Sequence, residues 1–413
     1  MDDLVSLPDV EAARELISGV VRTTPLEPSR PLSALLGVPT WLKCENLQRA
    51  GSYKVRGAYV RISRLSAAER DRGVVAASAG NHAQGVALAA SLLGIPSTVF
   101  MPVGAPLPKV AATRNYGAAV EFRGSTVDEA LVAAQEFAEE TGAMFIHPFD
   151  HPHVIAGQGT VALEILEQCP DVRTIVTGVG GGGLISGLAV ATKALRPDVR
   201  VIGVQAAGAA AFPPSLAAGS PVRLSSIGTI ADGIAVGCPG EVTFRHVSKL
   251  CDDVVTVSDE DISRALVMLL ERGKMVVEPA GAVGVAALLA GAIEVGDGPV
   301  VAVLSGGNID PLLLLRLIEH GLAAAGRYLR FAVRCGDRPG QLAELLSRIA
   351  QLQANIVDVE HLRHNPRLRI GEVEVALSVE TRGSGHSEAL LRALRENGYS
   401  VRLAQGDERR DQP

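Results

Sequence analysis

One lysine in the N-terminal part of the chain stands in an unusual setting. Lys54 lies in ENLQRAGSYKVRGAY, residues 45–59, which reads as the start of a buried helix. An amine is costly to bury unless it is paired, neutral or covalently bonded, although a lysine on an apolar surface can also extend its charged end into water. Lys54 is therefore a candidate for chemistry, and the rest of the chain must decide between a reactive lysine and a surface one.

Four consecutive glycines form a second candidate, a site for an anion. Gly180, Gly181, Gly182 and Gly183 occur in TGVGGGGLISG, directly after an apolar run and before an expected helix. Backbone N–H groups at such a helix start can surround a phosphate, and the helix dipole favours its charge. The segment has neither the lysine of a P-loop nor the spacing of a dinucleotide fingerprint, so it fits a single phosphate monoester. The alternative is a flexible turn without a ligand.

Three further loops follow predicted strands, at the edge where open α/β sheets bind ligands. SAGNH, residues 78–82, could hold a carboxylate through its N–H groups, or it is an ordinary helix cap. LSGGNID, residues 304–310, offers the hydroxyl of Ser305 to a ligand ring atom. TIADGIAVGCPG, residues 229–240, reads as irregular, and its composition assigns it no role. A buried lysine together with a phosphate loop indicates pyridoxal phosphate.

These loops need a scaffold of parallel strands and helices. Short apolar runs alternate with helix-like segments such as HAQGVALAASLLG, which predicts parallel sheets covered on both faces. The runs fall into two clusters, before and after about residue 150, which indicates two sheets. They lie at 73–78, 97–102, 118–123, 143–148, 174–179, 199–205 and 299–307. The apolar stretch 275–304 is interrupted by Glu278, Pro279 and glycines, so it reads as a helix and a strand rather than a membrane span.

The pattern changes after residue 320. Strand, helix, strand, strand, helix and strand follow in order, which is the ferredoxin-like βαββαβ arrangement. We expect a linker at 321–328, this module at 329–405 and a polar tail at 406–413.

The composition narrows the classes of function. Of 413 residues, 47% are hydrophobic, which supports large buried cores in two or three domains. The net charge is −6 without long charge runs, which argues against a nucleic-acid or anionic-membrane partner. The five cysteines are widely spaced and form no C-x-x-C pair, so they fit a reducing compartment better than a disulfide framework or a zinc site. The acidic N-terminus reads as an amphipathic helix rather than a signal peptide, and we expect a cytoplasmic protein.

Six motifs together resemble the threonine dehydratase (threonine ammonia-lyase) family of fold-type II pyridoxal-phosphate enzymes. They occur in family order: ENLQRAGSYKVRGA, SAGNHAQG, GVGGGGLISG, TIADGIAV, VVEPAGAVG and LSGGNID. The C-terminal module, with DRPGQL and ETRG, resembles an ACT regulatory domain. The resemblance implies an α/β fold with a two-lobed, mostly parallel catalytic unit at 1–320 and a C-terminal ACT domain. Residues from roughly 50 to 150 would form the small lobe, inserted in the larger one.

The resemblance implies pyridoxal phosphate as the cofactor and assigns residues to it. Lys54 would be the Schiff-base lysine and base, and Tyr53 stands beside the ring where relatives have phenylalanine. Ser305, a neutral partner for the pyridine nitrogen, would make a weaker electron sink than an aspartate. The other implied contacts are Asn81 with the ring hydroxyl, Gly180, Gly181, Gly182, Gly183 and Leu184 with the phosphate, Gly233 and Glu278 along the cofactor, and Ser78, Asn81 and His82 with the substrate.

The implied reaction is β-elimination of L-threonine to 2-oxobutanoate and ammonia, and of L-serine to pyruvate. Ala79 stands where serine racemases carry a proton-donating serine, which favours dehydration over racemisation. Gln205 stands where relatives with a divalent-cation site have a glutamate, so no metal is expected there. A monovalent cation held by carbonyls stays open. A serine-preferring dehydratase, a hydroxyaspartate ammonia-lyase and an inactive amino-acid sensor stay open as alternatives.

The ACT-like module implies allosteric regulation by a small molecule. Its loop with Asp337, Pro339 and Gly340 corresponds to one that binds small amino acids in relatives, often across a dimer interface; a purely structural role is the alternative. Isoleucine biosynthesis and catabolism both fit the motifs. The architecture implies a homodimer or a homotetramer.

Overall fold

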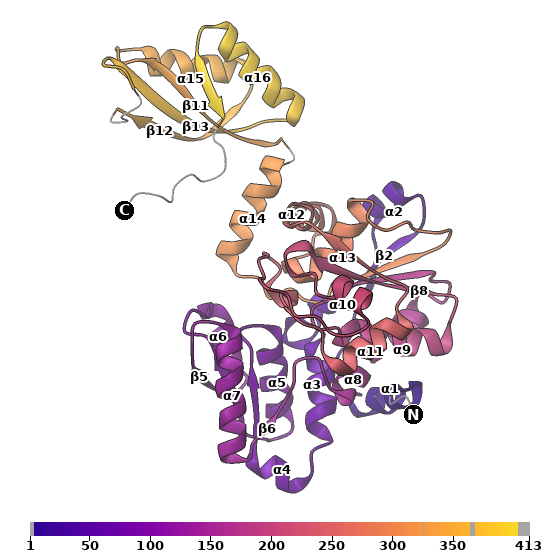
Figure 1. The fold of residues 1–413 in the computed structure, drawn as a ribbon. Coiled ribbons are helices and arrows are strands. Elements are labelled where there is room, and N and C mark those ends of the chain that lie inside the picture. The colour runs from indigo at the N-terminus through magenta and orange to yellow at the C-terminus, as the bar shows by residue number, and fades with distance from the viewer. Residues whose placement is uncertain (1–3, 325, 364–367, 404–413) are drawn as a thin grey trace. The chain divides into compact units, whose positions relative to one another are not determined.

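The computed structural model describes residues 4–324, 326–363 and 368–403, so the tail predicted at 406–413 lies outside the described residues. The chain divides into two compact units, Met1–Leu314 and Leu315–Pro413 (Figure 1). The segment predicted as a linker, 321–328, begins inside helix α14 (Pro311–Ala324).

The larger sheet of the first unit has the strand order β1-β2-β10-β7-β8-β9. Every neighbouring pair is parallel except β1 and β2. The strands are β1 (Leu26–Pro28), β2 (Thr40–Lys43), β7 (Thr174–Gly178), β8 (Arg200–Ala206), β9 (Asp253–Val257) and β10 (Val300–Val303). The helices of this large lobe are α1 (Leu7–Leu16), α2 (Arg30–Leu36), α8 (Pro152–Gln168), α9 (Gly183–Leu195), α10 (Phe212–Ala218), α11 (Glu241–Leu250), α12 (Asp259–Met268) and α13 (Pro279–Leu289).

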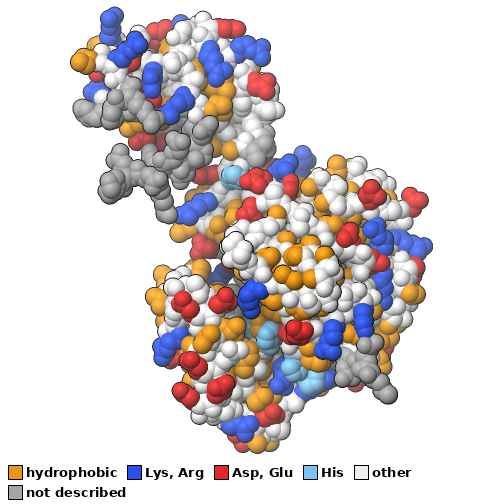
Figure 2. Space-filling model, in the orientation of Figure 1, with side chains coloured by type: hydrophobic (Ala, Val, Ile, Leu, Met, Phe, Trp, Pro, Cys, Tyr) orange, Lys and Arg blue, Asp and Glu red, His pale blue; other side chains and the backbone are white. Residues whose placement is uncertain are grey.

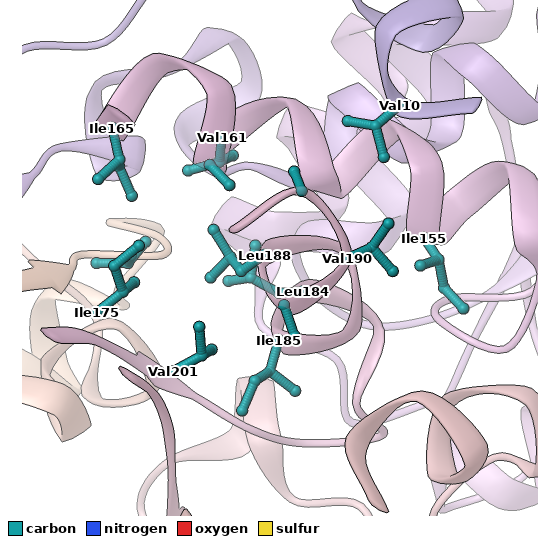
Figure 3. Close-up of a cluster of buried hydrophobic side chains, with 14 of the residues drawn as sticks. Val10, Ile155, Val161, Ile165, Ile175, Leu184, Ile185, Leu188, Val190 and Val201 are labelled. Atoms are coloured by element: carbon teal, nitrogen blue, oxygen red, sulfur yellow. The ribbon is translucent and has the colours of Figure 1, made fainter. Parts of the chain in front are cut away.

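The core of the large lobe lies between helices α8 and α9 and the sheet. Figure 3 shows Val161 and Ile165 of α8 facing Leu184 and Leu188 of α9, with strand residues completing the cluster. Small residues let the two helices approach closely, since a Cβ on Gly187 would collide with the backbone of α8. Because α9 follows the four glycines, this packing fixes the position of the glycine loop.

The smaller sheet is entirely parallel, with the order β5-β4-β3-β6. Alternate residues of β3 face opposite sides: Val74 and Ala76 belong to a cluster with α5, whereas Val75 and Ala77 pack with α7. The apolar runs are therefore continuous because both faces are covered (Figure 1). The elements of this small lobe are α3 (Lys54–Ser63), α4 (Ala67–Arg72), β3 (Val74–Ala77), α5 (Asn81–Leu92), β4 (Ser97–Met101), α6 (Leu107–Asn115), β5 (Ala119–Phe122), α7 (Val127–Thr141) and β6 (Met144–Phe145).

The second unit contains an antiparallel sheet of order β12-β13-β11-β14 with two helices. Its elements are β11 (Tyr328–Gly336), α15 (Gln341–Gln351), β12 (Asn355–Leu362), β13 (Glu372–Glu380), α16 (Ser384–Glu396) and β14 (Ser400–Leu403). Apolar residues of both helices and the strands form one core, which includes Phe331, Leu345 and Leu390. The predicted βαββαβ order is confirmed, as is the α/β class of the whole chain.

All seven apolar runs predicted as strands in the first unit contain strands, but β1, β2 and β9 have no counterpart in the prediction. Strand β2 ends in the buried Lys43, which interrupts the apolar pattern. On the face of the molecule shown in Figure 2, acidic and basic side chains are interspersed. Across the ranges that the structure describes, no helix is both long and apolar enough to cross a membrane.

Candidate active site

Lys54 is the first residue of helix α3 and lies between the two lobes of the first unit. Its side chain is half-buried, and its Nζ donates a hydrogen bond to the carbonyl of Pro148 at 3.0 Å. The amine also lies 5.3 Å from the centre of the Tyr53 ring. Burial lowers the pKa of Lys54 to about 8, although the carboxyl of Glu278 opposes the shift. A minor fraction of the amine is therefore neutral near physiological pH, larger than for an ordinary lysine, and the neutral form is the one that a nucleophile or base requires.

A buried group of charges, the Arg56 cluster, anchors the start of α3 to the large lobe. It consists of Lys43, Glu45, Arg56 and Glu164. Arg56 has no exposed surface and bonds Glu45 in a bidentate manner, at 2.9 and 2.7 Å, and Glu164 at 2.7 Å. The paired charges pin α3 two residues after Lys54, so the cluster fixes the backbone from which the reactive amine extends.

Asn81 is the centre of a polar chain beside Lys54. Its Nδ2 donates to Glu278 Oε1, and its Oδ1 accepts a bond of 2.8 Å from Asn308. The Nδ2 of Asn308 also bonds the carbonyl of Ala50 at 2.7 Å. Burial and the charge of Asp232 raise the pKa of Glu278 to about 7, against the effects of nearby lysines and Asn81. Glu278 is therefore a buried acid that can exchange a proton near neutral pH.

Ser305 joins this group through the backbone. Its carbonyl accepts a bond of 3.2 Å from the N–H of Tyr53, and Ser52 pairs with Gly306. The side chain is 5% exposed, and its hydroxyl has only a weak contact of 3.5 Å with the carbonyl of Ala280. The hydroxyl thus lies beside the Lys54 segment with hydrogen-bonding capacity left for a ligand.

The glycine loop is held by side chains that leave no room for a Cβ. Gly182 has a φ of +98° and caps α9, a left-handed conformation that favours glycine. A Cβ on Gly181 would collide with the ring of Phe149, and one on Gly180 would lie 3.1 Å from Ile234. Thr243 donates a 2.6 Å bond to the carbonyl of Gly181. The first N–H groups of α9, those of Gly183 and Leu184 among them, have no partner within the helix and can receive an anion.

The loop and the amine are linked by a continuous series of contacts. Pro148, which bonds Lys54, adjoins Phe149, which packs on Gly181. On the other side, Ile234 meets Gly180, and the adjacent Gly233 would place a Cβ 3.6 Å from Glu278.

These residues fit pyridoxal phosphate. The set contains an amine for its aldehyde, a helix start for its phosphate, and neutral polar groups for its ring. A side chain at position 306 would crowd these groups, since a Cβ on Gly306 would collide with Glu278 and lie 2.8 Å from Asn81.

The residues predicted to bind the substrate carboxylate divide into two kinds. Ser78 and Asn81 are half-buried, and the hydroxyl of Ser78 accepts a 3.1 Å bond from the N–H of Gly80. His82 is 5% exposed, and its Nε2 lies 2.8 Å from the carbonyl of Ile146. Burial, aided by the charge of Lys54, lowers the pKa of His82 to about 3, so its ring is neutral.

Gln205 uses its whole amide for protein contacts. Its Nε2 donates to the carbonyls of Val179 at 3.2 Å and Ala209 at 3.3 Å, and its Oε1 accepts from the N–H of Phe212 at 2.8 Å. These bonds join Gln205 of β8 to Val179, which directly precedes the glycine loop, and to the residues that lead into α10. Within the described residues, no group of three His, Cys, Asp or Glu side chains could hold a metal ion.

Three polar residues of the site escaped the sequence reasoning. Asn308 lies inside the motif LSGGNID, and its position after the strand was the available signal. Asp232 lies in TIADGIAV, where the family resemblance gave a role to Gly233 alone, and it pairs with Lys109 of α6 at 2.6 Å. Only the fold brings these two segments together.

In the second unit, the loop with Asp337, Pro339 and Gly340 is exposed and joins β11 to α15. Asp337 pairs with Arg363 at 3.3 Å, and its N–H bonds the carbonyl of Gly371 at 2.8 Å. Gly340 caps α15 with a φ of +90°.

Comparison with known proteins places the chain among enzymes of this kind. A family model described as pyridoxal-phosphate dependent enzyme matches residues 17–306. L-threonine ammonia-lyase of Thermotoga maritima is 49% identical over 97% of this chain and 100% of that protein. The enzyme of the same name from Geobacter sulfurreducens is 48% identical over 95% of this chain and 98% of that protein.

Solved structures agree. The processed form of threonine deaminase isoform 2 from Solanum lycopersicum superposes with a TM-score of 0.73 at 41% identity, covering 76% of this chain and 92% of that one. Maize serine racemase superposes with a TM-score of 0.73 at 38% identity, covering 78% and 98%.

Proposed function

The chain belongs to the threonine ammonia-lyase family of pyridoxal-phosphate dependent enzymes, and we propose that it converts L-threonine to 2-oxobutanoate and ammonia. The series of contacts from Lys54 through Phe149 to the glycine loop carries the proposal, because it joins a reactive amine to a phosphate-binding helix start. L-Serine, which would yield pyruvate, is proposed as a second substrate.

Each side chain has a definite task in this proposal. Pyridoxal phosphate, when bound, withdraws electrons from the α-carbon of an amino acid and so acidifies its α-proton. Lys54 would hold the cofactor, and its free amine would accept that proton at Nζ; the pKa of about 8 suits both tasks. Gly180, Gly181, Gly182, Gly183 and Leu184 hold the phosphate. Tyr53 packs beside the ring.

The ring is proposed to be held by neutral groups. Asn81 would contact the ring hydroxyl and Ser305 the pyridine nitrogen, while Gly233 and Glu278 would line the cofactor. Because a serine hydroxyl does not hold the pyridine nitrogen protonated as a carboxylate would, the elimination is favoured over reactions that need a long-lived carbanion. Glu278, with its pKa raised to about 7 by burial, holds a proton beside Asn81.

The loop from Ser78 to His82 is proposed to bind the substrate carboxylate. Ser78, Asn81 and His82 would contact it, and the bond of His82 to the carbonyl of Ile146 also holds the loop. Ala79 packs against the apolar core of the small lobe and has no proton to give, which supports elimination over racemisation.

The C-terminal domain is proposed to regulate the catalytic domain. We assign 1–320 to catalysis, with roughly 50–150 as the small lobe, 321–328 to a linker and 329–405 to an ACT-like domain. A small-molecule effector would bind near Asp337, Pro339 and Gly340, a loop exposed in the structure. A homodimer or homotetramer in the cytoplasm, acting either in isoleucine biosynthesis or in threonine catabolism, completes the proposal.

One assay tests the proposed function. Formation of 2-oxo acid by the purified holoenzyme would be followed with L-threonine, L-serine and L-hydroxyaspartate, each with and without isoleucine. Turnover that is fastest with threonine supports the proposal, and inhibition by isoleucine supports the biosynthetic role. Faster turnover of hydroxyaspartate or serine would assign the chain to those substrates instead, and no product from any of them would contradict the proposal.

A further inference from the structure

A single ion pair joins Lys109 of the small lobe to Asp232 of the large lobe. Lys109 lies in α6, and Asp232 begins the short helix η4 (Asp232–Ile234). The Nζ to Oδ2 distance is 2.6 Å, and the two side chains are 12% and 56% exposed. The lysine is thus largely shielded from water although its partner is not, which distinguishes the pair from an ordinary surface ion pair.

The Lys109 amine lies at the loop proposed to bind the substrate. Its Nζ would be 3.9 Å from a Cβ on Gly80, the residue between Ala79 and Asn81. On the other side, Asp232 adjoins Gly233, which lies against Glu278. The pKa of Glu278, raised chiefly by burial, is raised further by Asp232 and lowered by Lys109, so both charges act on the site.

An amino-acid substrate brings a carboxylate to a loop without a formal positive charge of its own. Ser78 and Asn81 are neutral, and the buried His82 has a pKa lowered by burial and by Lys54. Lys54 is committed to the cofactor in the proposed function. Since charge-assisted hydrogen bonds are stronger than neutral ones, a cation beside this loop would contribute strongly to substrate binding.

We propose that Lys109 is a substrate-binding residue whose ammonium exchanges Asp232 for the carboxylate of the amino-acid substrate. Asp232 holds the lysine in place in the free enzyme and competes with the substrate for it. This inference rests on the proposed function, because it takes the loop from Ser78 to His82 as the carboxylate site.

The alternative is that the pair only ties the two lobes together. The two explanations predict different effects on substrate binding when the partners are removed one at a time. If the pair is a tie, removing either partner has the same effect on substrate binding. If Lys109 binds the substrate, removing Lys109 weakens binding, whereas neutralising its competitor Asp232 strengthens it.

The first experiment measures kcat and KM for L-threonine in the holoenzyme and in Lys109→Met and Asp232→Asn. The inference predicts a KM about tenfold higher in the first variant, with kcat changed less, and a lower KM in the second. Lys193→Met is the matched control, because Lys193 pairs with Asp252 at 2.8 Å elsewhere on the large lobe. An unchanged KM in Lys109→Met, or a higher KM in both variants, would overturn the inference.

The second experiment removes the charge from the ligand. Binding of L-threonine and of L-threonine amide would be followed after rapid mixing, before product forms, through the visible absorbance of the bound cofactor. Lys109→Met should weaken binding of the acid about tenfold and leave binding of the amide within about twofold of the wild type. Equal weakening of both ligands would contradict a contact with the carboxylate. This binding measurement does not depend on turnover, so it tests Lys109 even if the wild type forms no 2-oxo acid from threonine.

Discussion

Two lysines on the same stretch of chain show how differently this protein treats buried charge. Lys43, fully buried, donates to Glu164 at 2.6 Å, to the carbonyl of Thr24 at 2.8 Å and to Gln168 at 2.9 Å. Lys54 is half-buried and bonds the carbonyl of Pro148. Lys43 has a carboxylate and two further acceptors for its three protons, whereas Lys54 has a neutral partner.

The buried acids repeat the contrast. Burial alone would raise the pKa of Glu164, but Arg56 and Lys43 reverse the shift and lower it. The pKa of Glu278 rises to about 7, because burial and the charge of Asp232 outweigh the two nearby lysines and the hydrogen bond from the neutral amide of Asn81. Charges that are fully paired stabilise a fixed arrangement, while charges with neutral partners can change protonation. The first kind anchors α3, and the second kind surrounds the proposed chemistry.

The largest expected effect is on turnover in Lys54→Ala. Removing the amine eliminates both the attachment of the cofactor and the proposed base, so we expect 2-oxo acid formation to fall by at least about a thousandfold. The free energy of unfolding, measured in urea, should change little because the partner of this amine among the described residues is the neutral carbonyl of Pro148. Activity above about a tenth of the wild type would contradict the role of Lys54.

The second prediction concerns the Arg56 cluster. Arg56→Met leaves Glu45 and Glu164 buried without their main partner and should lower the free energy of unfolding by about 3–5 kcal/mol. The matched control is Arg14→Met, because Arg14 pairs with Glu167 where both side chains are about half exposed, and it should cost less than about 1 kcal/mol. Urea unfolding of the three proteins gives the comparison, and equal losses in both variants would refute the contrast between buried and surface charges.

The third prediction compares the effects on activity of alanine substitutions at two glycines of the first unit. Gly306→Ala would force Glu278 and Asn81 apart and should lower kcat/KM about tenfold. In Gly284→Ala, a helix position of α13, the new methyl group meets Val176 at an ordinary 3.4 Å, so activity should stay within about twofold. Steady-state kinetics on both variants checks this, and an unaffected Gly306→Ala would show that the acid–amide pair is dispensable.

The last prediction concerns the pH dependence of stability. The pKa of His82 falls from 6.5 to about 3 in the folded chain, mainly through burial. Between those values the unfolded chain binds more protons, so the stability due to a neutral His82 is lost as pH falls below 6.5. The slope is at most about 1.4 kcal/mol per pH unit. Urea unfolding from pH 7 to pH 4 should show that the free energy of unfolding falls less steeply with pH in His82→Asn than in the wild type. An identical pH dependence in both proteins would show that His82 does not contribute to it.

Much of the catalytic framework could be predicted from local sequence. The apolar runs predicted the strands, and the carboxyl ends of those strands predicted where Ser78, the four glycines and Ser305 lie. The unusual setting of Lys54 was visible because its neighbours in the sequence are apolar or small. Where a functional side chain and the residues that hold it are contiguous in the chain, the motif can be recognised from the sequence.

The partners of the buried charges could not be predicted in this way. Lys43 meets Glu164, and Lys109 meets Asp232, across separations that only the folded chain closes. Nothing in the sequence indicates that Arg56 is buried or that Asn308 reaches Asn81, because the tertiary fold determines which distant residues come within hydrogen-bonding distance. The bond of His82 to Ile146 has the same origin, and it ties the loop of the proposed substrate contacts to the end of β6.

One measurement tests the central claim most directly. The chain contains six lysines, at positions 43, 54, 109, 193, 249 and 274. Borohydride reduction of the holoenzyme fixes pyridoxal phosphate on the lysine that holds it, and mass spectrometry of the peptides identifies that lysine. The account predicts the label on Lys54 alone, with none on the fully paired Lys43. A label on any other lysine, or none at all, would contradict it.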